Sequence, residues 1–144
     1  MNVQKFILKS ETDTIKLASK ISRQVTQGFT LTLTGELGSG KTFLCRHIIK
    51  SLCGRDTKIS SPTFNLLQTY QAQNFEIYHF DLFRINHLEE VYELGIEEAL
   101  SYSVCLIEWP AIITDILPQD TISLSINILN DFTRVVKIFG AIIL

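Results

Sequence analysis

The chain has 144 residues, 46 % of which are hydrophobic, and its formal net charge at pH 7 is −2. The length predicts one domain over residues 1–144, and the apolar content excludes a disordered chain. The nearly balanced charge disfavours a protein that holds nucleic acid by itself, because such proteins carry a strong excess of basic side chains.

Strands and helices alternate in the first part of the chain. Residues 5–8 predict a short strand, and Ser10 is placed to cap a helix that is expected to end at Gly28. A β-rich run at 29–34 predicts a second strand, and a second helix is expected from Lys41 to Gly54. Apolar residues recur at helical spacing along the first helix: Ile15, Ala18, Ile21 and Val25.

The second part of the chain is richer in strands. Residues 63–71 and 75–83 predict a hairpin, and an acidic helical region at 87–101 is interrupted at Gly95. The short apolar run at 104–109 is typical of a buried strand, and two late strands are expected at 121–129 and 134–143. This pattern predicts a single α/β domain whose sheet mixes parallel and antiparallel strands and is flanked by helices.

The segment GELGSGKT at 35–42 lies between a predicted strand and a predicted helix. It fits the phosphate-binding pattern G-x-x-x-x-G-K-[ST], in which glycines allow several backbone N–H groups to converge on phosphate oxygens. The following helix adds the positive end of its dipole. Lys41 is expected to reach the β- and γ-phosphates, and the Thr42 hydroxyl to bind Mg²⁺. ATP is favoured over GTP, because no guanine-reading Asn-Lys-x-Asp segment occurs in the sequence.

Two acids follow apolar strands, as a P-loop protein requires for its metal and its attacking water. Glu108 ends the more apolar strand and is favoured for the metal shell, together with Thr42. Asp81 is expected to contact the nucleotide, orient water or join the metal shell. His79 shares a strand face with Asp81 and is expected to support it, although a His/Asp/Glu metal site is an alternative.

Two further segments have open interpretations. Thr63, in SSPTF at 60–64, either belongs to a Ser/Pro turn or senses the γ-phosphate as switch segments do. Trp109 and Pro110 either complete the core or face a partner. Cys45, Cys53 and Cys105 have no metal-type spacing and are expected to be reduced core thiols.

The N-terminal segment does not resemble a signal peptide, and no apolar run is long enough to cross a bilayer. We therefore expect a cytoplasmic protein that does not associate with membranes.

Five motifs stand in order along the chain: GELGSGKT, SPTFNLLQTY, YHFDLFR, LEEVYELGIEEAL and CLIEWP. Together they resemble the TsaE (YjeE) family of bacterial P-loop ATPases, which are required for threonylcarbamoyladenosine in tRNA. The similarity covers roughly residues 30–120, and it implies a P-loop NTPase fold. One departure is the unusually apolar segment 111–117, which is either a partner surface or local packing.

The resemblance implies roles for particular residues. Lys41, Thr63, Asp81 and Glu108 are implied in ATP hydrolysis, and Thr42 and Glu108 in binding Mg²⁺. The start of the first helix and the loop before the last strand are implied near the nucleotide, through Glu11, Thr12 and Phe132. The remaining implied nucleotide contacts come from the loop and strand ends: Gly35, Leu37, Gly38, Ser39, Gly40, Lys41, Thr42, Phe43 and Asp81.

The resemblance also implies partners, a TsaD-like transferase and a TsaB-like companion. ATP turnover would support their cycle without being the group-transfer step, with weak turnover by the protein alone and stimulation by the partners. The tRNA would be contacted only through that complex, and DNA is not expected as a ligand.

Three other functions compete with this interpretation. A small-molecule kinase would need an arginine-bearing lid, and the five arginines do not cluster in such an insertion. A nucleotide-dependent binding module would keep Lys41 and Thr42 but would not hydrolyse ATP. Direct RNA binding is disfavoured by the charge.

Overall fold

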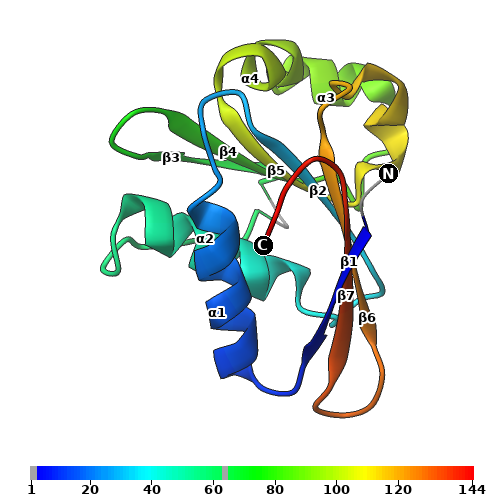
Figure 1. Cartoon of the computed structure of the whole chain (residues 1–144). Helices are drawn as coiled ribbons and strands as arrows, with labels where there is room; N and C mark the ends of the chain where they lie inside the picture. Colours follow the sequence, from blue (N-terminus) through cyan, green and yellow to red (C-terminus); the bar gives the residue numbers. More distant parts are fainter. Residues whose placement is uncertain (1–2, 63–64) are drawn as a thin grey trace.

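The computed structural model describes residues 3–62 and 65–144, and its centre is a seven-stranded sheet in the order β1-β7-β6-β2-β5-β4-β3 (Figure 1). The strands are β1 Val3–Leu8, β2 Thr30–Thr34, β3 Leu67–Gln71, β4 Glu76–Asp81, β5 Val104–Glu108, β6 Ile122–Ile128 and β7 Arg134–Phe139. The helices are α1 Glu11–Ser22, α2 Lys41–Cys53, α3 Leu88–Glu93, α4 Ile96–Tyr102 and the 3₁₀ helix η1 Pro110–Ile116.

Four parallel strands, β6, β2, β5 and β4, form the middle of the sheet. Antiparallel pairs extend it on both sides: β3 joins β4, and β7 lies between β6 and β1. The predicted mixed sheet and the predicted hairpin of β3 and β4 are therefore confirmed, and the two predicted late strands, β6 and β7, also pair with each other. Because β2 has parallel neighbours on both sides, the loop that leaves its carboxyl end lies in the middle of the sheet edge, where ligands of α/β proteins usually bind.

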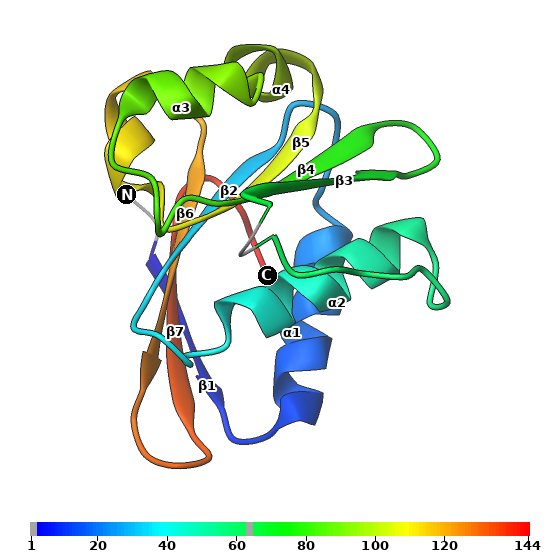
Figure 2. The same cartoon turned by 180° about the vertical axis from the view of Figure 1, so that it is seen from behind.

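Helices cover both faces of the sheet, as Figures 1 and 2 show. Helices α1 and α2 pack together over one face, while α3, α4 and η1 lie over the other. Alternate residues of β5 supply the two cores, with Leu106 toward α1 and α2 and Ile107 toward α3 and α4. All of β5 is buried, which explains its continuous apolar sequence.

Helix α1 is shorter than predicted. It begins after Ser10, whose side chain accepts a hydrogen bond from the backbone of Asp13, as expected of a cap. It ends at Ser22 and not at Gly28, because tight turns follow in which the Gln24 and Val25 N–H groups donate to carbonyls only three residues back. The predicted apolar face was also wrong in part, since Ile15 is 41 % exposed. The buried helical face consists of Thr14, Leu17, Ala18, Ile21 and Ser22.

Two predicted strands were too long. The strand predicted at 63–71 begins at Leu67, because Leu66 has a φ of 65° that interrupts the extended backbone. Residue Thr63 lies outside the described residues. The strand predicted at 134–143 ends at Phe139, before Gly140, which has a φ of 132°. Gly95, with a φ of 81°, separates α3 from α4, so the predicted interruption there is confirmed.

The apolar segment 111–117 is mostly explained by packing within the molecule. Ile113 is 1 % exposed, and Ile112, Ile116 and Leu117 pack against the core under α3 and α4. Within residues 3–62 and 65–144, no helix has both the length and the apolar character needed to cross a membrane.

The three cysteines are free thiols. Cys45 and Cys105 are buried as predicted, whereas Cys53 is only half-buried. Burial raises the pKa of Cys105 to about 12, so this thiol is protonated at neutral pH.

Candidate nucleotide-binding site

The glycine loop joins the carboxyl end of β2 to the amino end of α2. Gly35 has a φ of 149°, and a side chain there would collide with the Ile126 carbonyl oxygen of β6. Gly40 has a φ of 110° at the position that precedes α2. Both positions therefore require glycine. The loop can then turn back over the start of α2, where free backbone N–H groups favour an anion.

Lys41 folds back onto this loop. Its Nζ donates to the carbonyl oxygens of Gly35 at 2.7 Å and Glu36 at 3.0 Å, and lies 4.3 Å from the centre of the Trp109 ring. The residue is only 4 % exposed, and burial lowers the pKa of its ammonium group. The ammonium is thus held at the loop by neutral carbonyls and an aromatic face, contacts that phosphate oxygens can replace.

Two side chains fix the loop to the β6–β7 hairpin. The Glu36 carboxylate accepts a hydrogen bond from the Ile128 backbone N–H at 3.1 Å. The Arg134 guanidinium donates to the Ser39 carbonyl at 3.1 Å and to the Asn130 carbonyl at 3.2 Å. Neither role was predicted from the sequence. The Glu36–Ile128 and Arg134–Ser39 contacts join positions more than ninety residues apart, and no local pattern signals them.

Glu108 and Asp81 lie side by side, because they are paired positions in the parallel strands β5 and β4. Glu108 is 2 % exposed, and its Oε1 accepts a hydrogen bond from the Thr42 hydroxyl at 2.7 Å. Asp81 is 6 % exposed, and its Oδ1 accepts from the Phe83 backbone N–H at 3.1 Å. The structure thus brings both predicted acids to the same end of the glycine loop.

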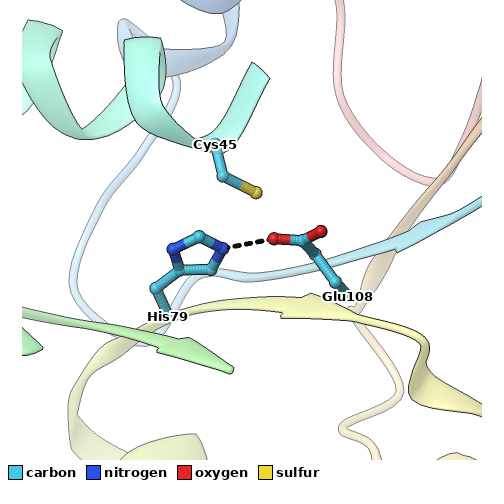
Figure 3. Close-up of side chains that lie close together, drawn as sticks. All are labelled: Cys45, His79 and Glu108. Carbon is cyan, nitrogen blue, oxygen red and sulfur yellow. Dashed lines mark hydrogen bonds and ion pairs between the residues drawn. The ribbon is translucent and has the colours of Figure 1, made fainter. Parts of the chain in front are cut away.

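His79 bonds to Glu108, so the expectation that it supports Asp81 was wrong. Its Nε2 lies 2.6 Å from Glu108 Oε2, and the ring is fully buried (Figure 3). The cause is the register of the parallel strands: His79 pairs with Leu106, which places Glu108 diagonally across from its ring.

Cys45 of α2 points toward this pair, as Figure 3 shows. Ligand atoms of Cys45, His79 and Glu108 all lie within 4.8 Å of one another. This donor set suits a soft metal such as Zn²⁺. The His79–Glu108 hydrogen bond already accounts for the short distances, however, and burial and the nearby carboxylates raise the pKa of the Cys45 thiol well above its usual value.

Two hollows meet at Gly40 and Phe43. The larger, of about 470 Å³, lies between the start of α1, the glycine loop and the β6–β7 loop. The predicted contacts Glu11, Ser39 and Phe132 line it, but Thr12 does not and is exposed. The smaller, of about 280 Å³, is lined by most of the other predicted residues and by Phe83 and Trp109, whereas the predicted contact Gly35 lines neither hollow. Its lining residues are Leu37, Gly38, Gly40, Lys41, Thr42, Phe43, Asp81, Phe83, Glu108 and Trp109.

Trp109 has an unusual backbone conformation at the end of β5. Its φ of 58° and ψ of 61° lie in the left-handed region, and its N–H donates to the Leu33 carbonyl at 3.1 Å. This turn places the ring 4.6 Å from that of Phe83 and over Lys41. Rare conformations of this kind cluster at functional sites. Trp109 is thus half-buried at the mouth of the smaller hollow and is not a core residue.

A glycine loop that connects a central parallel strand to the following helix, with a lysine and a threonine at the start of that helix, defines the P-loop NTPase fold. The sequence model for the threonylcarbamoyl adenosine biosynthesis protein TsaE matches residues 8–136. The chain therefore belongs to the TsaE family, and the resemblance identified from the motifs is confirmed.

Individual relatives agree with this assignment. The chain is 48 % identical to the tRNA threonylcarbamoyladenosine biosynthesis protein TsaE of Rickettsia felis, over 92 % of this chain and 77 % of the relative. It is 31 % identical to the TsaE of Treponema pallidum, over 92 % and 97 % of the two chains. The crystal structure of Bacillus subtilis YdiB superposes with a TM-score of 0.76 at 26 % identity, covering 96 % of this chain and 86 % of that one.

Proposed function

We propose that this protein is a Mg²⁺-dependent ATPase that supports the formation of threonylcarbamoyladenosine in tRNA. The observation that carries the ATPase proposal is the hydrogen bond from the Thr42 hydroxyl to Glu108, at the start of α2 and beside Lys41. The biological role rests on membership of the TsaE family, whose curated members are named for this modification.

The two hollows suggest how ATP binds. The phosphates would lie on the glycine loop, and the base and ribose would enter the larger hollow between α1 and the β6–β7 loop. Phe132 is 81 % exposed there and offers a ring face to a base. Lys41 would exchange its carbonyl contacts for phosphate oxygens. Arg134 and Glu36 would keep the loop in place during this exchange.

The donor set fits Mg²⁺, which prefers a hydroxyl or a carboxylate together with phosphate oxygens and water. The Thr42 hydroxyl donates a hydrogen bond to Glu108, which leaves the lone pairs of the hydroxyl oxygen available to a cation. When bound, Mg²⁺ neutralises charge on the β- and γ-phosphates. Thr42 and Glu108 are the residues that would hold it.

The hydrogen bonds suggest a division of labour between the two acids. Thr42 contacts one oxygen of Glu108 and His79 contacts the other, so this carboxylate is held in place and is suited, together with Thr42, to the Mg²⁺ side of the site. Asp81 also lines the smaller hollow, next to Glu108. We assign to Asp81 the orientation of the attacking water.

The mouth of the smaller hollow is suited to a protein partner. Leu37 is 67 % exposed and Phe83 is 47 % exposed, and Trp109 lies beside them. Exposed apolar side chains that rim a catalytic hollow often mark a contact surface. We propose that the TsaD-like transferase and its TsaB-like companion bind here and accelerate hydrolysis, and that tRNA is contacted only through them.

Phosphate release from ATP with Mg²⁺, with and without the purified transferase and companion, tests this function. We expect slow release by the wild-type protein alone and faster release with the partners. The stimulation should be lost in Glu108→Ala and kept in the control Glu98→Ala, which changes an exposed acid of α4. Nucleotide binding without release under any condition would favour a binding module. Rapid release that partners do not change would contradict the accessory role.

A further inference from the structure

Glu108 is a buried carboxylate whose orientation is not fixed by the backbone alone. It lies at the last position of β5, beside Asp81 and behind Thr42. A glutamate side chain has three rotatable bonds, so one hydrogen bond from Thr42 would still allow the carboxylate to rotate. A buried carboxylate oxygen without a partner is also unfavourable.

His79 supplies the second fixed point. Its Nε2 lies 2.6 Å from Oε2, the Glu108 oxygen that Thr42 does not use. In the tautomer that carries its proton on Nε2, the imidazole donates this hydrogen bond to the carboxylate. The ring itself cannot move freely, because His79 is fully buried in the middle of β4 and packs beneath Cys45 (Figure 3).

The second ring nitrogen supports a dedicated role for this contact. His79 Nδ1 is buried and has no hydrogen-bond partner among residues 3–62 and 65–144. A residue that served only to fill this space would be better replaced by an apolar side chain, which would bury no unpaired nitrogen. The imidazole therefore costs stability at Nδ1 and contributes only one polar contact, the one to Glu108.

We propose that His79 is a positioning residue for Glu108 and Thr42, the two residues that would hold Mg²⁺. It holds Glu108 in the rotamer that accepts the hydrogen bond from the Thr42 hydroxyl, which would leave the Thr42 oxygen available to Mg²⁺. This role rests on the proposed ATPase function and extends it beyond the phosphate loop and the two acids. Partners behind a ligand commonly change metal affinity or activity about 10–100-fold.

Trp109 provides a readout that does not depend on turnover. It is the only tryptophan in the chain, and its ring lies 4.3 Å from Lys41 Nζ, which ATP is expected to draw away. Fluorescence titrations would use a non-hydrolysable ATP analogue. One series without Mg²⁺ gives the affinity for the nucleotide alone. A second series, with varied Mg²⁺, gives the Mg²⁺ concentration at which half of the metal-dependent fluorescence change is reached. The variants are His79→Leu, which removes the donor, and His79→Gln, whose amide can restore it.

For His79→Leu, we expect the required Mg²⁺ concentration to rise about tenfold, with nucleotide affinity in the absence of metal unchanged. His79→Gln should recover most of the loss. The control Cys105→Ala removes a buried thiol from the core under α3 and α4, on the other face of the sheet from His79, and should keep the wild-type Mg²⁺ requirement. In a Glu108→Gln background, His79→Leu should have little further effect.

Several results would overturn the proposal. If His79→Leu responds to Mg²⁺ as wild type does, His79 has no positioning role. If His79→Gln is as impaired as His79→Leu, His79 acts through packing alone. The same conclusion holds if both variants lose nucleotide affinity without metal and also melt at a lower temperature than Cys105→Ala. If the wild-type protein binds no nucleotide, the proposed function fails together with this role.

Discussion

Replacing Lys41 by alanine is expected to reduce phosphate release about 100–1000-fold, the loss typical when a preorganised electrostatic contact to a transition state is removed. Lys41 is the one basic side chain among the described residues that line the smaller hollow. Its ammonium is already at the glycine loop, held by two carbonyl oxygens and the Trp109 ring. Initial rates of phosphate release at saturating partner and Mg²⁺ concentrations would measure the effect.

Lys50→Ala is the matched control for this experiment. It removes the same charge from the last turn of the same helix, α2, away from the loop. We expect near-wild-type release from Lys50→Ala and an unchanged fold for both variants by circular dichroism. Release by Lys41→Ala at the wild-type rate would show that the loop does not bind the transferred phosphate.

Glu108→Gln is expected to lower Mg²⁺-dependent release about 100-fold, because it keeps the shape of the side chain but removes its charge. Asp81→Asn should lower the maximal rate as well, but with little change in the Mg²⁺ concentration required, since we assign Asp81 to the water. Rates measured over a range of Mg²⁺ concentrations separate the two effects. Glu98→Gln on α4 serves as the exposed control.

The opposite result is equally informative. If Asp81→Asn changes the Mg²⁺ requirement and Glu108→Gln changes only the maximal rate, the two roles are exchanged. Full activity of Glu108→Gln would contradict a metal role for the Thr42–Glu108 hydrogen bond.

The sequence predicts those parts of the site that depend on local pattern. Glycine positions and the following Lys-Thr pair locate the loop, because few residue types tolerate its backbone angles. Asp81 and Glu108 are found as acids that follow apolar strands, and parallel pairing then places them together. The mixed sheet follows from the alternation of strands and helices.

The rest depends on contacts that no local pattern encodes. His79 bonds to Glu108 rather than to its strand neighbour Asp81, which follows from the strand register. Arg134 reaches the glycine loop because the β6–β7 hairpin lies next to β2. The end of α1 was misplaced because tight turns replace the helix after Ser22, before the glycine is reached. Thr63 falls outside the described residues, so its switch role stays a prediction.

The most direct test of the account is where ATP binds. Backbone amide chemical shifts of isotope-labelled protein, recorded before and after adding Mg²⁺ and a non-hydrolysable ATP analogue, would locate the nucleotide. We predict the largest changes at 35–43, with further changes at the start of α1 and at 131–134, where the larger hollow lies. Saturating changes confined to another surface, or none at all, would contradict phosphate binding by the glycine loop.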